Sequence, residues 1–171
     1  MFNLFHEEPI LLNLPDAEFI YYPNFFSKEK ADLFFEILLN ETPWQHDEIT
    51  IFGKKILQPR LTSLYGNDGK SYGYSNIVMH PHPFNSTLTF IKDEIENTIE
   101  EHFTTILLNL YRNEKDSNGW HADNEKELGV NPVIASVSFG SERNFQLKHN
   151  NDKALKKNIF LEHGSLLLMK G

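Results

Sequence analysis

The sequence contains no cysteine. The chain can therefore form no disulfide, thiolate metal site or cysteine nucleophile, and we expect a cytoplasmic protein in a reducing compartment. Long hydrophobic runs are absent too, and residues 1–8 contain no basic segment followed by an apolar one. We therefore predict no signal peptide, no transmembrane helix and no membrane partner. Glycine-rich phosphate loops and H-E-x-x-H zinc motifs do not occur either.

The chain also lacks an excess of positive charge, since its formal net charge is −8. This balance argues against a nucleic-acid partner, because contacts to phosphates need positive charge. The basic residues are unevenly distributed, however, so the net charge alone decides nothing. One group contains Lys54, Lys55 and Arg60, and a second contains Lys148, Lys153, Lys156 and Lys157.

The composition is otherwise that of an ordinary globular protein. Hydrophobic residues make up 40% of the 171 residues and charged residues 23%, which suits one domain with its own core. We therefore interpret residues 1–171 as a single domain and expect a monomer. The 14 Phe, 6 Tyr and 2 Trp fit either a sandwich core or stacking surfaces for planar ligands.

Apolar residues that recur every three to four positions predict two helices. Ser27 is the expected N-cap of a helix over residues 28–40, and Ser86 is the expected N-cap of a second helix that continues to about His102. The apolar stripe of the second helix contains Leu88, Ile91, Ile95, Ile99 and Phe103.

Alternating apolar residues predict strands, most of them after residue 104. The predicted segments are 19–22, 49–52, 55–58, 105–112, 133–139, 144–149, 158–161 and 165–169. Helices early and strands late indicate an α+β fold, with helices packed on one face of a mainly antiparallel sheet. A double-stranded β-helix, or jelly roll, fits this order of strands.

A histidine and a carboxylate lie two positions apart in Trp120-His121-Ala122-Asp123-Asn124-Glu125. On an extended segment both side chains point to the same side, so one metal ion can bind both. Two histidines and one carboxylate form the facial triad of non-haem Fe(II) oxygenases. The spacing alone identifies no second histidine.

Upstream of this pair, Asn109 and Tyr111 share one face of a predicted strand with Leu107. An amide and a phenol on one strand face fit a polar pocket. The alternative is an ordinary barrel strand with a hydrated inner surface. We expect His121 and Asp123 to face inward beside Asn109 and Tyr111.

Taken together, these motifs resemble the AlkB family of Fe(II)- and 2-oxoglutarate-dependent dioxygenases, which repair alkylated nucleic acid bases. The resemblance covers about residues 18–171. The segments that carry it are Asn109-Leu110-Tyr111, Trp120 to Glu125, Pro132 to Gly140, Arg143-Asn144-Phe145 and His163 to Met169. Residues 58–66 and 72–75 resemble the family's nucleotide-recognition segment, which we expect within about residues 49–76.

The resemblance implies roles for individual residues. His121 and Asp123 resemble two of the three Fe(II) ligands and are the expected catalytic centre. Asn109 and Tyr111 resemble the residues that bind the co-substrate 2-oxoglutarate. The positions that resemble substrate-binding residues are Pro59, Arg60, Tyr72, Tyr74 and Glu125, with Tyr74 expected to stack on a flipped-out base.

In the family, the distal iron-binding histidine and a strand with two arginines follow the segment that matches His163-Gly164-Ser165. The sequence ends at Gly171 before either element, so we expect a domain that lacks its C-terminal strands and binds Fe(II) weakly. His149 and His163 are alternative sources of a third ligand, although His163 matches a non-ligand position.

The function implied by the resemblance is oxidative dealkylation of N-alkylated bases in DNA, which makes alkylated DNA the expected partner. Three alternatives stay open. The first alternative is a catalytically inactive nucleic-acid-binding fragment. The second is a dealkylase that acts on RNA or protein. The third is a hydrolase with a divalent metal at His121 and Asp123.

Overall fold

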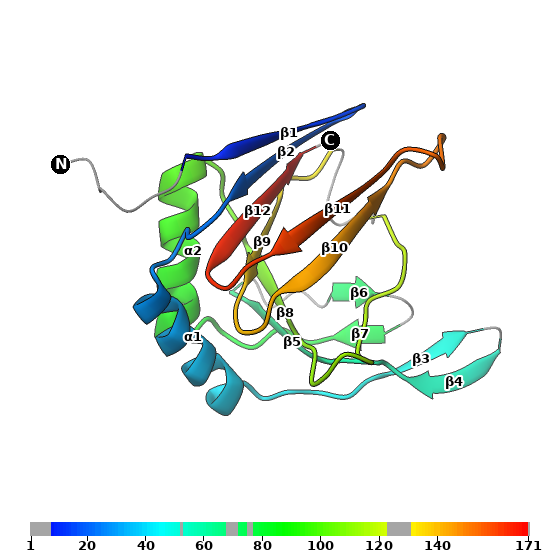
Figure 1. Cartoon of the computed structure of the whole chain (residues 1–171). Helices are drawn as coiled ribbons and strands as arrows, with labels where there is room; N and C mark the ends of the chain where they lie inside the picture. Colours follow the sequence, from blue (N-terminus) through cyan, green and yellow to red (C-terminus); the bar gives the residue numbers. More distant parts are fainter. Residues whose placement is uncertain (1–7, 52, 68–71, 75–76, 123–130, 171) are drawn as a thin grey trace. The chain divides into compact units, whose positions relative to one another are not determined.

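A computed structural model describes residues 8–51, 53–67, 72–74, 77–122 and 131–170 of the chain (Figure 1). Within these residues the protein is built mostly of β-strands, together with the two helices α1 (Lys28–Glu41) and α2 (Ser86–Ile99). No described helix is long and apolar enough to cross a membrane. The chain divides into two compact units, of which unit 1 combines residues 1–38 with 124–171 and unit 2 comprises residues 39–123.

Unit 1 contains a four-stranded antiparallel sheet in the order β1-β2-β12-β9 (Figure 1). A separate antiparallel hairpin is formed by β10 and β11. The strands of this unit are β1 (Ile10–Leu14), β2 (Ala17–Tyr22), β9 (Ile134–Ser138), β10 (Arg143–Lys148), β11 (Lys156–Leu161) and β12 (Ser165–Lys170). Strand β12 pairs with β2 on one side and β9 on the other, and its residues Ser165 to Leu168 are buried, as expected for the run Leu166-Leu167-Leu168.

The hydrophobic core of unit 1 joins the sheet to the β10–β11 hairpin. Tyr21 of β2 and Leu167 of β12 form one buried cluster with Ile159 and Leu161 of β11. Partly buried side chains from β1 and β10 extend it, among them Leu12 and Phe145. Two layers of strands therefore bury their apolar faces against each other, as in a β-sandwich.

Helix α1 packs on unit 1 through aromatic residues. Phe34 of α1, Phe26 before the helix and Phe139 after β9 are in mutual contact, with ring centroids 5.3 to 6.0 Å apart. Ser27 precedes the helix, and its Oγ accepts from the backbone N of Lys30 at 3.4 Å, so the predicted N-cap is confirmed.

Unit 2 pairs its strands in three antiparallel couples, β3–β4, β5–β8 and β6–β7. These strands are β3 (Glu48–Ile51), β4 (Lys54–Leu57), β5 (Leu61–Gly66), β6 (Tyr72–Tyr74), β7 (Ile77–Met79) and β8 (Thr105–Leu110). The predicted hairpin around Gly53 is confirmed, and this glycine has φ +77°, a value that favours glycine.

The predicted second helix begins and ends differently from the expectation. Its N-cap is Asn85, whose Oδ1 accepts from the backbone N of Leu88 at 2.8 Å, so the prediction of Ser86 was wrong by one residue. The helix ends at Ile99 rather than near His102, because Glu100 adopts a left-handed conformation with φ 57° and caps it. The buried residues Leu88, Ile91 and Ile95 do belong to the predicted stripe.

Mostly antiparallel strands with two helices agree with the predicted fold class. Several predicted strands are present with ends shifted by one to two residues, for example β8 at 105–110 where 105–112 was expected. Strand β1 was not predicted, because Ile10-Leu11-Leu12-Asn13-Leu14 lacks regular alternation. This strand pairs with β2 in the structure.

Candidate functional site

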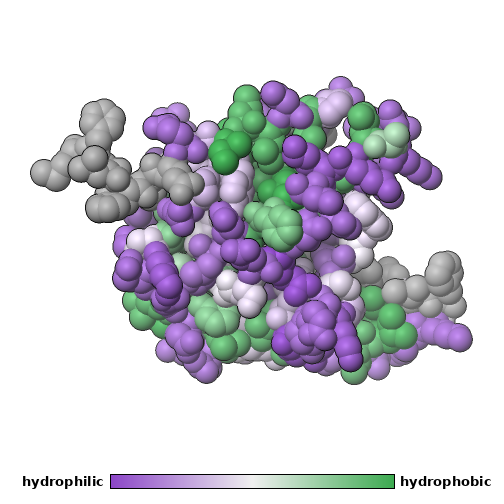
Figure 2. All heavy atoms as spheres, viewed as in Figure 1, coloured by the Kyte–Doolittle hydropathy of each residue, from purple (hydrophilic) through white to green (hydrophobic). Residues whose placement is uncertain are grey.

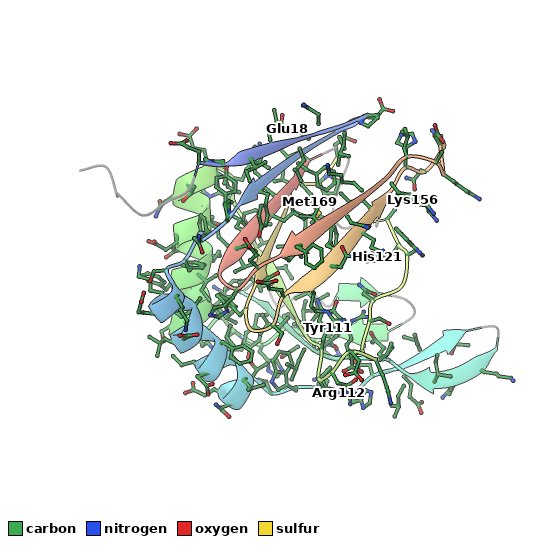
Figure 3. All side chains as sticks on the ribbon, in the orientation of Figure 1. Glu18, Tyr111, Arg112, His121, Lys156 and Met169 are labelled. Atoms are coloured by element: carbon green, nitrogen blue, oxygen red, sulfur yellow. The ribbon has the colours of Figure 1, made fainter. Side chains whose placement is uncertain are left out.

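The candidate co-substrate residues lie at the end of β8. Strand β8 pairs with β5 so that Asn109 lies opposite Thr62 and Leu107 opposite Leu64. Leu107 and Asn109 thus share a strand face, as predicted. Tyr111 follows directly after the strand and is half-buried, whereas Asn109 is exposed. Figure 3 shows Tyr111 and Arg112 just beyond the end of β8, with His121 farther along the same segment.

The loop between β8 and His121 is held by an ion pair. Asp116 is buried and accepts three hydrogen bonds from Arg112, namely from the backbone N at 2.9 Å, Nε at 2.7 Å and a terminal nitrogen at 3.0 Å. These bonds to Arg112 lower the pKa of Asp116 from 3.8 to about 2. Asp116 is therefore ionised at neutral pH and closes residues 112–116 into a compact turn.

A second anchor of this loop is Arg60, which is only 4% exposed. Its Nε donates to Oδ1 of Asn109 at 2.9 Å, and one terminal nitrogen donates to Oδ1 of Asn118 at 2.9 Å and to the carbonyl of Ser117 at 3.5 Å. The carbonyl of Pro59 also accepts from the backbone N of Ser117 at 2.8 Å. The start of β5, the end of β8 and the loop before His121 are thus tied together.

His121 lies outside the strands, and its side chain is exposed. The expectation that His121 faces inward was therefore wrong, because this segment is irregular and strand alternation does not apply to it. Its Nδ1 lies 2.8 Å from the carbonyl oxygen of Gly119. A carbonyl can only accept, so Nδ1 donates and the lone pair of the neutral ring is on Nε2, the atom through which this tautomer binds a metal.

Other predicted site residues lie partly or wholly outside the described residues. Asp123 and Glu125 are outside them. Strand β6 is described for its backbone, with Tyr72 opposite Met79 and Tyr74 opposite Ile77. Among the described residues, no three His, Asp or Glu side chains form a group that could hold a metal ion.

The two alternative third ligands have both ring nitrogens engaged. The Nδ1 of His163 accepts from the backbone N of Gly140 at 2.8 Å, and its Nε2 lies 3.1 Å from Asp32. The Nδ1 of His149 accepts from the backbone N of Asp152 at 3.0 Å, and its Nε2 lies 3.2 Å from Asp16. Either ring would have to give up such a contact to bind iron, so both are better explained as structural residues.

The roles of Asp116, Arg112 and Asn118 in this arrangement were not predicted from the sequence. Arg112 and Asp116 have opposite charges and lie four residues apart, a spacing that can mark an ion pair. Glu114 and Lys115 between them offered competing partners, so the spacing alone could not single out this pair. For Asn118 the sequence contains no comparable signal.

Comparison with known proteins assigns the chain to a family. The model of the 2OG-Fe(II) oxygenase superfamily matches residues 18–171. The chain is 40% identical to alpha-ketoglutarate-dependent dioxygenase alkB homolog 3 of Homo sapiens over 88% of its own length and 55% of that protein. The Bos taurus protein of the same name is also 40% identical, with 87% of this chain and 54% of the relative covered.

A second kind of relative is more distant. DNA oxidative demethylase ALKBH2 of Homo sapiens is 32% identical over 86% of this chain and 60% of that protein. The chain thus spans somewhat more than half the length of the curated relatives that it matches. With a family model that matches nearly all of it and AlkB homologues at 32–40% identity, the chain belongs to the 2OG-Fe(II) oxygenase superfamily as an AlkB-like member.

Proposed function

We propose that this protein is an Fe(II)- and 2-oxoglutarate-dependent dioxygenase that removes alkyl groups from N-alkylated bases in DNA. The observation that carries the proposal is the connection between β8 and His121. Asn109 and Tyr111 stand at the end of β8, and a loop pinned by Arg60 and Asp116 leads from them to His121. The names of the relatives support it, because one is an alpha-ketoglutarate-dependent dioxygenase and the other a DNA oxidative demethylase.

In this proposal His121 and Asp123 hold the iron, and Asn109 and Tyr111 hold 2-oxoglutarate. His121 fits the role because its hydrogen bond to Gly119 leaves the lone pair on Nε2 and its ring is exposed to an arriving ion. Asn109 and Tyr111 can each donate a hydrogen bond to a carboxylate. When bound, iron would supply the oxidation of the alkyl carbon by O2, with 2-oxoglutarate as the co-substrate that is oxidised alongside it.

We propose a double-stranded β-helix as the complete fold. The sandwich of the four-stranded sheet and the β10–β11 hairpin in unit 1 supports this architecture. In such a fold the two sheets bury a shared core, as Tyr21, Leu161 and Leu167 do here.

Residues 49–76 are the proposed nucleotide-recognition segment. Tyr74 is assigned to stacking on the flipped-out base, with Tyr72, Pro59 and Glu125 as further contacts. The β3–β4 hairpin supports a binding role, because its β4 side chains are all exposed, including Ile56 at 43% and Leu57 at 54%. Figure 2 shows hydrophobic and hydrophilic atoms side by side over this hairpin, at the lower right of the view.

The β10–β11 hairpin supports binding of a polyanion. Its register places Lys148 directly opposite Lys156, and Lys157 and Lys153 follow on β11 and in the turn. Lys153, Lys156 and Lys157 are exposed, so this end of the hairpin presents positive charge to a negatively charged partner. A local concentration of lysines thereby offsets the net charge of −8 at this site.

The test uses the full-length protein with Fe(II), 2-oxoglutarate and DNA that contains 1-methyladenine or 3-methylcytosine. His121→Ala and Asp123→Ala should abolish both 2-oxoglutarate turnover and repair. Tyr74→Ala should weaken repair while most of the uncoupled 2-oxoglutarate turnover remains, because stacking contributes about 1–3 kcal/mol per base. Normal repair by Tyr74→Ala would overturn the assignment of the stacking residue.

The same assay separates the alternatives. A catalytically inactive nucleic-acid-binding protein would bind methylated DNA without consuming 2-oxoglutarate. An RNA dealkylase would act on the same bases in RNA and leave DNA unchanged. A hydrolase would react without 2-oxoglutarate altogether.

A further inference from the structure

Arg60 lies where three parts of unit 2 meet, although it was first matched to a substrate-binding position. The side chain is 4% exposed, and its guanidinium donates to oxygens of Asn109, Asn118 and Ser117. A buried guanidinium with these contacts offers little surface to a nucleobase. Its contacts lead instead to a candidate co-substrate residue and to the loop before His121.

The hydrogen bond from Arg60 fixes the orientation of the Asn109 amide. A guanidinium has donors only, so the atom of Asn109 that faces Nε at 2.9 Å must be the oxygen. The NH2 group of the same amide must then point away from Arg60. Since Asn109 is exposed, this NH2 group is presented as a donor at the surface of β8.

The hydrogen bond from Arg60 to Asn109 is also strong enough to maintain this orientation of the amide. Hydrogen bonds from a charged donor are stronger than those between neutral groups, and their directionality is sharper when the donor is the planar guanidinium. An amide without this constraint could flip and present its oxygen instead, which would repel a carboxylate. Arg60 therefore favours the one amide orientation that suits an anionic ligand.

A terminal nitrogen of Arg60 binds the loop that precedes His121. Asn118 Oδ1 accepts at 2.9 Å, and the adjacent residue Ser117 is bound to the carbonyl of Pro59 through its backbone N. His121 follows three residues after Asn118, and its ring is held by Gly119. Arg60 thus contacts Asn109 at one end of the segment that leads to the candidate metal ligand, and Ser117 and Asn118 a few residues before its other end.

We infer that Arg60 is a positioning residue, which presets the amide of Asn109 as a donor to a carboxylate of 2-oxoglutarate. The inference rests on the proposed function, because that proposal assigns 2-oxoglutarate to Asn109. It assigns Arg60 to preparing the co-substrate site rather than to contacting the base.

The test measures binding of 2-oxoglutarate by calorimetry, with Mn(II) as a metal that does not turn over. Arg60→Gln should weaken binding by about tenfold, the size of one charge-assisted hydrogen bond. Asn109→Ala should weaken it at least as much. The double variant should be no weaker than Asn109→Ala alone, because Arg60 acts through that amide. Multiplied losses in the double variant would overturn the inference.

Arg112→Gln is the matched control. It breaks the ion pair with Asp116 in the same loop, and Arg112 makes its bonds to Asp116 rather than to Asn109. Binding of 2-oxoglutarate should change by less than about twofold. An equal loss in Arg112→Gln and Arg60→Gln would mean that loop stability alone matters, which would overturn the role of Arg60.

Asn109→Asp keeps the inference testable if Arg60→Gln does not fold. The carboxylate would retain and strengthen the bond to Arg60 but would replace the donor NH2 with a second acceptor oxygen. The folded variant should lose 2-oxoglutarate binding by at least about tenfold, through the lost bond and the added repulsion. Normal binding by this variant would overturn the inference.

A readout without co-substrate separates this inference from the proposed function. In the metal-free protein, the side-chain NH2 resonances of Asn109 should shift in Arg60→Gln and remain unchanged in Arg112→Gln. If these shifts are seen but the native protein binds no 2-oxoglutarate, the positioning geometry holds and the proposed function fails. If the resonances do not respond to Arg60→Gln, the positioning role is wrong whatever the protein binds.

Discussion

Arg112 and Asp116 bind each other through three hydrogen bonds across a single turn that follows β8. The carboxylate is buried, and the guanidinium beside it lowers its pKa from 3.8 to about 2. Because the pKa is lower in the folded state, this pair stabilises the fold fully above about pH 4. The stabilisation is lost as the pH falls through about 2.

Asp116→Asn should therefore lower the unfolding temperature by about 2–4 °C at pH 7. The difference in unfolding temperature from the native protein should shrink as the pH falls from 4 to 2, because the native carboxylate becomes increasingly protonated over this range. Thermal unfolding monitored by circular dichroism across this range measures both effects. Glu114→Gln, in an exposed position of the same loop, is the control and should behave like the native protein. A difference that stays constant down to pH 2 would contradict the prediction.

Gly164 has φ +76°, and a Cβ at this position would lie 2.7 Å from the carbonyl oxygen of Phe26. Gly164→Ala should therefore destabilise the protein in two ways, by about 1–2 kcal/mol from the left-handed conformation and by about 1–3 kcal/mol from the contact. Urea unfolding measures the sum.

Gly53→Ala isolates the first of these effects. Gly53 has a nearly identical φ of +77°, but a Cβ there would meet nothing within 4 Å. Gly53→Ala should lower the free energy of unfolding by about 1–2 kcal/mol, clearly less than Gly164→Ala does. Equal losses at both positions would show that the backbone at Phe26 moves aside.

Asn85→Ala should destabilise helix α2 by about 1 kcal/mol, because it removes the side-chain acceptor for the backbone N of Leu88. Ser86→Ala, at the first position inside the helix, should change the free energy of unfolding by less than about 0.5 kcal/mol. Chemical denaturation of the two variants decides between the N-cap seen in the structure and the one expected from the sequence. A larger effect of Ser86→Ala would favour the latter.

Substitution of His121 should affect metal binding but not stability, and substitution of His163 should affect stability but not metal binding. His121→Ala should abolish binding of Fe(II) or Mn(II) and change stability by less than about 0.5 kcal/mol, because the side chain is exposed. His163→Phe removes the acceptor for the backbone N of Gly140 and the contact with Asp32, which should cost about 1–2 kcal/mol.

Metal affinity should be unchanged in the folded His163→Phe protein. Electron paramagnetic resonance of bound Mn(II) provides the measurement for both variants. Loss of metal binding in His163→Phe, at a temperature where the variant is folded, would make His163 a ligand after all.

Lys156→Ala and Lys157→Ala should each weaken binding of single-stranded DNA at low salt. Each substitution should also reduce the slope of log affinity against log salt concentration by up to about 0.7, the contribution of one phosphate contact on a single strand. Fluorescence anisotropy at several salt concentrations gives the slopes. Lys92→Ala is the matched control, because Lys92 is paired with Asp93 and Glu96 on α2. Unchanged slopes in both hairpin variants would exclude this hairpin as a phosphate-binding surface.

The sequence by itself determined the local elements and the chemical type of the site. Periodicity placed α1, the β3–β4 hairpin and the strands after residue 104, because apolar side chains must lie on one face of each element to reach a core. The same sequence contains Asn109, Tyr111, His121 and Asp123 in the order that resembles the AlkB family. These features depend on near neighbours in the chain, so sequence was sufficient for them.

The tertiary structure decided which distant residues act together. Arg60 and Asn109 are 49 positions apart, and the pairing of β5 with β8 brings them into contact. Likewise His163 is held by Gly140 and Asp32, which no local pattern indicates. A hydrogen bond between distant residues depends on strand register and on burial, and both are set by packing of the whole unit rather than by local periodicity.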